Sequence, residues 1–256
     1  AGAPMEGRDQ ERLAADGAGG FWIANEGNPE KDRPHAIYHV DGTGAVTEEI
    51  AIPEELNAQQ VRFGFEGITL VGEGDDTTLW MAVQREWKDD DKGFVKLVSY
   101  TPASKEWGAV SYPLDTGEKG WVGLSEIVAH DGAVYIVERD NQIGSAAKIK
   151  KLYKVSLDQL QPAPLGGELP VVEKELVHDF LPDLLSLTNG YAVDKLEGFT
   201  FDAAGDGRHE GHELGRTRLR NALTKSSPAV CRRAFLSGGI LPGIAGKTGP
   251  YVINVC

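Results

Sequence analysis

One short motif that recurs along the chain constrains the fold more than any other feature. It is Glu66-Gly-Ile-Thr-Leu70, and the chain repeats it as Glu126-Ile-Val-Ala129 and as Glu197-Gly-Phe-Thr-Phe201. A degenerate fourth copy, Glu11-Arg-Leu-Ala-Ala-Asp16, carries Arg12 where the others carry Gly or Ile. The four glutamates are 55, 60 and 71 residues apart. Repeats of this period indicate a propeller, a solenoid or another array of similar units.

The segments that follow each motif repeat as well. Each motif leads through a Gly/Asp turn into a short apolar run with polar residues at its end, a pattern that indicates strands joined by hairpins. These second runs lie at 19–26, 79–86 and 134–141, and their aromatic residues are predicted to be core. Third runs lie at 37–41, 97–101 and 152–156, and weaker fourth runs at 46–52, 107–114 and 171–177. Four strands per unit predict an all-β protein, a β-propeller with three full blades and the start of a fourth.

The repeat pattern stops after residue 207. The sequence up to there is predicted to be a partial propeller, and residues 208–256 an atypical tail, irregular or partly helical. The tail contains eight Lys or Arg but only two Asp or Glu, and it holds both cysteines. We interpret the boundary as a discontinuity, from a shifted reading frame or a truncated or fused gene. The alternative is a divergent natural C-terminus.

An incomplete ring has a physical consequence. Three blades and a fraction do not close, and open sheets leave strand edges that pair with other chains. Closure of the ring normally removes that exposure. The sequence does not determine the oligomeric state. Pairing of these open strand edges with another chain is one route to assembly.

Composition limits the partners of the chain. The protein has 39 acidic and 26 basic residues, and its net charge is −13. This balance argues against nucleic acid and anionic membranes as partners, and it is compatible with cation binding. A solvated acidic surface is the alternative interpretation. The chain contains no apolar run of the roughly 18 residues that a membrane helix requires.

The repeated glutamates are the first candidates for a functional site. If each motif begins the innermost strand of a blade, then Glu66, Glu126 and Glu197 converge on a central channel. The ends of the second strands would add Glu26, Glu138, Asp140 and Asn141. Carboxylate and amide oxygens suit Ca²⁺, and crowded carboxylates can act as acid and base. Arg139 could pair with a carboxylate or hold a phosphate oxygen. The alternative is that each Glu braces its blade by accepting backbone hydrogen bonds.

With these residues in view, the sequence resembles the phytase-like family, also called the esterase-like activity of phytase family. The resemblance covers about residues 9–207. It is carried by the segments Phe21-Trp-Ile-Ala-Asn-Glu26, Glu66-Gly-Ile-Thr-Leu70, Leu79-Trp-Met-Ala-Val-Gln-Arg-Glu86, Gly123-Leu-Ser-Glu126, Val134-Tyr-Ile-Val-Glu-Arg-Asp-Asn141 and Lys195-Leu-Glu-Gly-Phe-Thr-Phe201. It implies an exported bacterial propeller, longer than this chain, that hydrolyses phosphoesters or carboxyl esters. Implied channel residues are Glu26, Glu66, Glu126, Glu138 and Glu197, with no assigned nucleophile.

Together these observations predict a secreted or periplasmic hydrolase that acts on a small anionic ester. In this reading Ca²⁺ polarises the substrate and a channel glutamate activates water. The predicted catalytic residues are Glu66, Glu126, Glu197 and Arg139; the predicted metal ligands are Glu26, Glu66, Glu126, Glu138, Asp140, Asn141 and Glu197. Two alternatives stay open: a propeller that binds a ligand without catalysis, and a metal-dependent propeller resembling sugar lactonases. Two features depart from the family pattern and put activity in doubt. Arg12 replaces the expected Gly of the first motif, and the basic tail replaces the acidic continuation that follows the last motif in the family.

Overall fold

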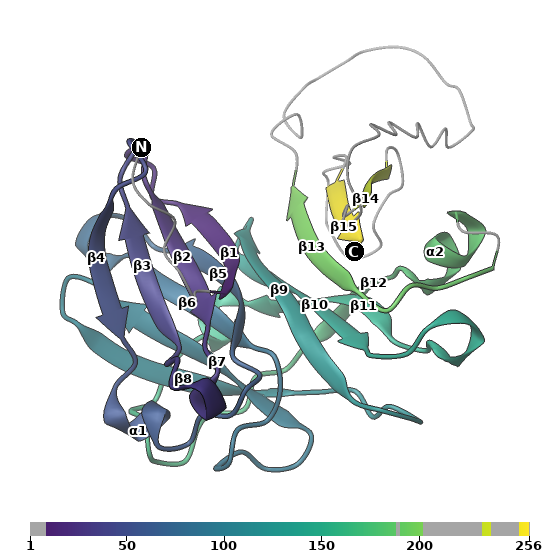
Figure 1. Cartoon of the computed structure of the whole chain (residues 1–256), viewed down its shortest axis with the longest axis horizontal. Coiled ribbons are helices and arrows are strands. Elements are labelled where there is room, and N and C mark those ends of the chain that lie inside the picture. The colour runs from purple at the N-terminus through teal and green to yellow at the C-terminus, as the bar shows by residue number, and fades with distance from the viewer. Residues whose placement is uncertain (1–8, 188–189, 202–231, 237–250, 256) are drawn as a thin grey trace.

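The protein is built almost entirely from β-strands. The computed structural model describes residues 9–187, 190–201, 232–236 and 251–255. Three four-stranded antiparallel sheets account for most of them, and each sheet follows the chain order strand by strand (Figure 1). The predicted all-β class is therefore confirmed. None of the helices in the described residues has the length and apolar character needed to cross a membrane.

The strands of the three sheets follow one another without crossovers. The first sheet contains β1 (Asp9–Ala15), β2 (Phe21–Glu26), β3 (Ala36–Val40) and β4 (Val46–Ala51). The second contains β5 (Phe65–Val71), β6 (Thr78–Val83), β7 (Phe94–Thr101) and β8 (Glu106–Pro113). The third contains β9 (Val122–His130), β10 (Ala133–Asp140), β11 (Lys150–Ser156) and β12 (Glu175–Asp179). Each of the three full sequence repeats thus forms one four-stranded sheet.

Short helices occupy the connections. The α-helices are α1 (Glu54–Asn57) and α2 (Leu181–Leu187). The 3-10 helices are η1 (Pro29–Lys31), η2 (Gly74–Asp76), η3 (Gly144–Ala146) and η4 (Leu157–Gln159). Both α-helices lie between one sheet and the next, α1 before β5 and α2 before β13 (Leu196–Phe201).

A fourth sheet begins at β13. This strand pairs with β15 (Tyr251–Val255), which pairs in turn with β14 (Arg232–Leu236). The sequence analysis expected the tail to be irregular or partly helical, and these two segments of it are strands instead. Residues 202–231 and 237–250, including the boundary predicted at 207, lie outside the described residues.

The sheets pack face to face, and apolar layers fill the spaces between them. Trp22, Ile37 and Met81 lie in the layer between the first and second sheets. A second layer, between the second and third sheets, contains Trp80 and Ile136. A third joins the third sheet to β13 and α2, and Tyr135 belongs to it. The aromatic residues predicted as core, Trp22, Trp80 and Tyr135, are all buried.

Strand composition follows from this stacking. In β6 every residue after Thr78 is buried, because apolar layers cover both faces of the second sheet. On the first sheet, by contrast, Leu13, Phe21 and Val46 are exposed. Leu13 pairs with Ile23, and Phe21 with Val40, which places these side chains on the face opposite the Trp22 layer.

The first strands of successive sheets lie beside one another. β1 contacts β5, β5 contacts β9, and β9 contacts β13. In Figure 1 they run in this order from the purple first sheet through the teal third sheet to the green β13. The strands that carry the repeated motif are therefore neighbours of one another, and we call these four the inner strands.

Each inner strand carries a β-bulge at the same place in the repeat. The pairing with its neighbour skips one residue, and the skipped residues are Glu11, Glu66, Ser125 and Glu197. A bulge leaves its extra residue unpaired in the ladder and redirects the side chain. The sequence analysis aligned Glu126 with the other glutamates, and this alignment was wrong by one residue. Leu124-Ser125-Glu126 matches Phe65-Glu66-Gly67, so Ser125 occupies the bulge and Glu126 the glycine position.

Gly67 explains why glycine follows the bulge in the second sheet. A Cβ atom at this position would lie 2.6 Å from the backbone nitrogen of Ile127 and 3.0 Å from the carbonyl carbon of Glu126. The absent side chain allows β5 to approach β9 closely. The inner strands thus meet backbone to backbone at this level.

The segment predicted as the fourth strand of the third sheet divides in two. β12 begins at Glu175 rather than at residue 171. Before it, Ala163 and Val171 form bridges with Ala109 and Ser111 of β8. Residues 163–171 therefore run along the outer edge of the second sheet and cover it before the chain returns to the third.

We predict that Gly67→Ala destabilises the protein by about 1–3 kcal/mol, because the added methyl group meets backbone atoms that cannot rotate away. Gly167→Ala is the matched control, since its nearest neighbour would lie 3.8 Å away. That control should stay within about 0.5 kcal/mol of the parent protein. Urea unfolding measures both, and equal stabilities of the two variants would contradict the close approach of β5 and β9.

Candidate active site at the bulges of the inner strands

Polar and charged side chains gather at one end of the inner strands. Each inner strand starts beside the end of the second strand of its own sheet, as Phe65 of β5 pairs with Val83 of β6. The bulge residues therefore lie at the same end of the sheets as the residues that follow β6 and β10. We call the resulting group the bulge cluster; it comprises Glu66, Gln84, Ser125, Arg139, Asp194, Lys195 and Glu197.

Arg139 connects the third sheet to the start of β13. Its side chain is only 3% exposed, and its Nε donates a hydrogen bond of 3.0 Å to Ser125 Oγ. Its Nη1 lies 3.5 Å from Asp194 Oδ1, and its Nη2 lies 3.9 Å from Glu197 Oε1. One guanidinium thus spans two bulge positions, Ser125 and Glu197. The sequence left open that Arg139 pairs with a carboxylate, and Asp194 and Glu197 are the carboxylates that lie beside it.

Lys195 is a second cation of the cluster and interacts with the carboxylates of Glu197 and Glu66. Its Nζ lies 2.8 Å from Glu197 Oε1, and that hydrogen bond is the main reason why the pKa of Lys195 is raised above its usual value. The charge of Glu66 raises the pKa further, and that of Arg139 opposes it. Glu66 itself is buried and accepts a hydrogen bond from Gln84 Nε2. The charges of the predicted residues Glu66, Arg139 and Glu197 therefore all act on Lys195.

Ser125 is fully buried, with no exposed surface. Its hydroxyl oxygen is held by Arg139. A buried hydroxyl that faces a cation acts as an acceptor and a spacer in this conformation, and is not placed to attack a substrate. Lys195, 54% exposed, Asp194, 41% exposed, and Glu197, 16% exposed, are the groups of the cluster that reach solvent.

Arg12 and Glu126 form an ion pair that crosses the inner strands. Arg12 Nε donates to Glu126 Oε2 at 2.8 Å, from β1 to β9. Both residues occupy the position that Gly67 fills in β5, the strand between them. Because Gly67 has no side chain, the space above β5 is free for this contact. Arg12, which departs from the family pattern, is thus paired with an acidic residue, Glu126, at the equivalent position of β9.

The pKa of Glu126 is raised to about 7. Burial is the largest cause, and the charge of Arg12 and the backbone hydrogen bonds from Ile127 and Phe199 only partly oppose it. The Phe199 contact comes from β13, so Glu126 is surrounded by inner strands of three sheets. A raised pKa is what a buried carboxylate with incomplete compensation should show.

Other predicted metal ligands form hydrogen bonds that hold neighbouring segments of the sheets together. Glu138 has no exposed side-chain surface, and it accepts hydrogen bonds from Tyr112, Lys174 and the backbone nitrogen of Asp115. Burial raises the pKa of Glu138, against the lowering effect of Lys174. Glu26 Oε1 accepts a 3.1 Å hydrogen bond from the Gly64 nitrogen. These contacts fit the bracing role that the sequence left open.

Asp140 and Asn141 are likewise occupied by their own sheet. Asp140 accepts hydrogen bonds from Lys150 Nζ at 3.0 Å and from the Ile149 nitrogen at 2.9 Å. Asn141 Oδ1 accepts from the Trp121 nitrogen at 3.1 Å, and the Trp121 oxygen accepts from the Asn141 nitrogen at 3.0 Å. Asn141 therefore fixes the backbone that enters β9.

The described residues do not fit a calcium site. Calcium takes six to eight oxygen ligands. Nowhere in the described part of the chain do three His, Cys, Asp or Glu side chains group closely enough to hold a metal ion. The carboxylates of the cluster face Gln84, Lys195 or Arg139 instead.

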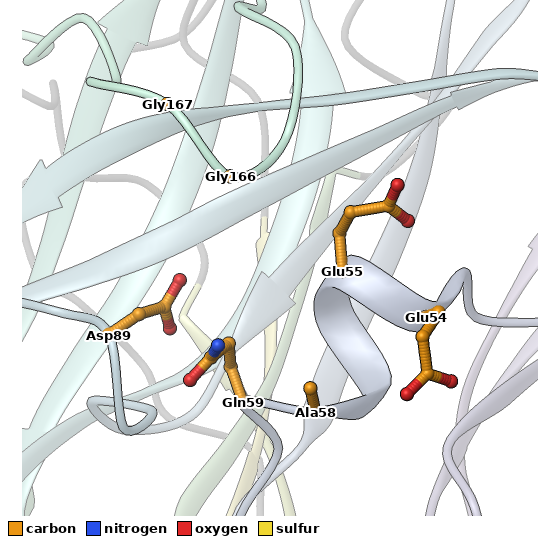
Figure 2. A pocket seen from close by; sticks show the side chains of 7 residues that line it. All are labelled: Glu54, Glu55, Ala58, Gln59, Asp89, Gly166 and Gly167. Carbon is orange, nitrogen blue, oxygen red and sulfur yellow. The ribbon is translucent and has the colours of Figure 1, made fainter.

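A separate hollow of about 510 Å³ lies away from the bulge cluster, between α1 and a loop of the third sheet. Figure 2 shows its lining: Glu54, Glu55, Ala58, Gln59, Asp89, Gly166 and Gly167. Three of these side chains are acidic, and Asp89 is held by Lys96 at 2.7 Å. A hollow with this lining repels an anionic ester, so it is not the candidate active site.

Sequence reasoning missed several members of the bulge cluster. Ser125 was hidden by the alignment of Glu126, although the motif Leu124-Ser125-Glu126 carries the apolar residue that marks the correct register. Gln84, directly after β6, was missed, although the alignment of Trp80 with Tyr135 gives it the same place in the repeat as the predicted Arg139 near the end of β10. Lys195 stands beside Asp194 and two residues before Glu197, and nothing in its spacing marks it.

The fold and this cluster define an all-β protein with repeated sheets whose inner strands enclose paired charges. Among known protein families, the model described as Phytase-like, esterase-like activity of phytase, matches residues 1–211. The chain belongs to this family. The match ends close to the boundary predicted at residue 207. A search of the curated proteins and a search of the solved structures gave no match.

We predict that Glu126 makes the stability depend on pH. Its folded pKa lies above the usual 4.5, so the native state binds the proton more tightly than the unfolded state. Its contribution is complete below pH 4.5 and is lost as the pH rises through about 7. In Glu126→Gln the fall in unfolding free energy across this window should be smaller. Arg12→Gln should steepen it, because Arg12 lowers the pKa. Urea unfolding at several pH values measures both slopes, and unchanged slopes in both variants would contradict this assignment.

A second prediction concerns the buried Glu138. Lys174→Gln removes its 2.7 Å cationic partner and should cost about 3–5 kcal/mol, because a buried charge is left uncompensated. Lys154→Gln is the control, since its partner Glu175 is 61% exposed. That change should cost no more than about 1 kcal/mol. Denaturant unfolding compares them, and a Lys174 effect as small as the control would show that Glu138 does not depend on this pair.

Proposed function

We propose that the three sheets are blades of a β-propeller and that the bulge cluster is the active site of an exported esterase-like hydrolase. The observation that carries the proposal is the bulge, repeated at Glu11, Glu66, Ser125 and Glu197. β-Bulges commonly occur next to active sites, where they redirect side chains. The four-stranded order of each sheet and the contact between successive inner strands support the propeller architecture. Family membership supports ester hydrolysis, and the export follows from the same resemblance.

The chemistry rests on Glu197, Lys195 and Arg139. The Glu197 carboxylate, partly exposed, takes a proton from a water molecule as the water oxygen bonds to the phosphorus or carbonyl carbon of the ester. Arg139 and Lys195 stabilise the negative charge that develops on the ester oxygens. The bond to the leaving alcohol then breaks, and Glu197 returns its proton to the departing oxygen. Glu66 and Gln84 hold the neighbouring side of the cluster.

A binding role without catalysis is the second candidate. It is favoured by the partners that carboxylates of the inner strands already have. Glu66 accepts a hydrogen bond from Gln84, Glu197 forms an ion pair with Lys195, and Glu126 forms an ion pair with Arg12. Carboxylates that are already compensated can serve to hold the inner strands together. In that case a ligand binds at this end of the sheets and leaves unchanged. Saturable binding of an ester without its turnover would identify this function.

We predict that Glu197→Gln lowers kcat for p-nitrophenyl phosphate or p-nitrophenyl acetate about 100-fold or more, the range for loss of a general base. Glu175→Gln makes the same chemical change at an exposed carboxylate and should leave kcat unchanged. Release of p-nitrophenol, with calcium or with EDTA, measures the rate and reports any metal assistance. The hydrolase proposal fails if the unsubstituted chain turns over neither ester in both conditions, or if Glu197→Gln retains full activity.

A further inference from the structure

Beside the bulge cluster, arginines and aromatic rings alternate in a row. Arg62 lies 5.8 Å from the ring centre of Phe63, measured from Cζ, and Arg85 lies 5.0 Å from the rings of both Phe63 and Trp121. Arg139 lies 5.0 Å from Trp121 on the same measure. We call these five residues the arginine–aromatic row. They come from the segments that enter β5 and β9 and from the ends of β6 and β10.

The guanidinium groups of this row have few acceptors. The nearest carboxylate oxygen to Arg85 belongs to Glu86 and lies 3.9 Å away, beyond hydrogen-bond distance. The Arg85 Nε is buried and has no hydrogen-bond partner among the described residues. Arg62 forms no ion pair with any described residue, and the ion pairs of Arg139 are 3.5 and 3.9 Å long. An unsatisfied buried donor is costly unless a ligand supplies the acceptor.

The other buried cations are treated differently. Arg12 lies 2.8 Å from its carboxylate, Lys174 lies 2.7 Å from Glu138, and Lys150 lies 3.0 Å from Asp140. The chain as a whole has 13 more acidic than basic charges, so carboxylates are abundant. Arg62 and Arg85 therefore differ from these cations, because neither has a carboxylate oxygen within hydrogen-bond distance among the described residues. An external anion meets little competition at this part of the row.

The row is also held in place before any ligand arrives. Asn141 fixes the Trp121 backbone by two hydrogen bonds, one accepted by its side-chain oxygen and one donated by its backbone nitrogen. A Cβ at Gly123 would lie 2.5 Å from the Gln84 oxygen and 3.1 Å from Trp121 Cζ3, so the glycine lets the ring pack against the segment that carries Arg85. The Arg85 side chain remains 28% exposed, and since its Nε is buried, the exposed surface belongs to the rest of the side chain. A ligand can therefore reach it from solvent.

We propose that the arginine–aromatic row is a binding site for a phosphate group, with Arg85 as its principal ligand. A guanidinium presents paired donors that match phosphate oxygens, and several arginines together suit a dianion. Trp121 and Phe63 form the apolar wall. If the row is part of the substrate site, the proposal rests on the proposed function, because Arg139 belongs both to the row and to the bulge cluster. The row would then hold a phosphate group of the ester. As a binding site it requires no turnover.

The test is a titration of the protein with inorganic phosphate, followed by calorimetry and by tryptophan fluorescence. Acetate at matched ionic strength separates a carboxylate preference from a phosphate preference. We expect saturable phosphate binding that Arg85→Gln weakens about tenfold or more, the loss typical of a hydrogen bond to a charged group. Arg85→Lys should recover only part of the affinity, because it keeps the charge and loses the paired donors. Trp121→Phe should abolish the fluorescence change.

Arg33→Gln is the matched control, since it removes one positive charge from an exposed arginine that is not part of the row. Its phosphate affinity should equal that of the parent protein, and circular dichroism checks that each variant is folded. The inference is overturned if phosphate does not bind saturably, if the two glutamine variants lose affinity equally, or if acetate binds as tightly as phosphate. Arg85-dependent binding without ester turnover would uphold the site and sink the hydrolase proposal. Turnover without such binding would do the reverse.

Discussion

The structure depends on the close approach of the inner strands, and the β-bulge decides what that approach brings together. One unpaired residue per inner strand redirects Glu66, Ser125 and Glu197 relative to the regular pleat. Gly67 removes the side chain that would keep β5 from β9. Apolar layers between the sheets hold this geometry from outside. The bulge cluster is therefore a consequence of how the sheets pack, and its residues come from segments far apart in the sequence.

Charge compensation sets the character of this region. An acidic chain that brings carboxylates to its inner strands needs cations there, and Arg12, Arg139 and Lys195 supply them. The compensation is uneven, because burial still raises the pKa of Glu126 to about 7. It is also locally exceeded, because the carboxylate oxygen nearest to Arg85, beside Trp121, lies 3.9 Å away. Carboxylates with cationic partners thus lie next to an arginine without a close acidic partner, a combination suited to anionic ligands.

Much of the fold was predictable because its repeat leaves a strong pattern. The third strands expected at 37–41 and 97–101 correspond to β3 and β7, because short apolar and aromatic runs that recur at a similar spacing are visible in sequence. Glu138, Asp140 and Asn141 were correctly placed at the end of a second strand, yet their partners Lys174 and Lys150 lie on other segments and could not be inferred. Ser125 was missed because a bulge shifts the register by one, and identity at Glu126 outweighed the apolar pattern. The pairing of Arg12 with Glu126 is a contact across 114 residues, which no local spacing reveals.

The central claim is that the inner strands of separate sheets converge on shared charges, and the most direct measurement is a double-mutant cycle between Arg12 and Glu126. Urea unfolding of Arg12→Gln, Glu126→Gln and the double variant at pH 8 yields the coupling energy. Residues in direct contact couple by about 0.5–3 kcal/mol, and for a buried pair at 2.8 Å we expect a value above about 1 kcal/mol. Additive effects within about 0.5 kcal/mol, as for independent sites, would show that β1 and β9 do not share this contact and would contradict the account.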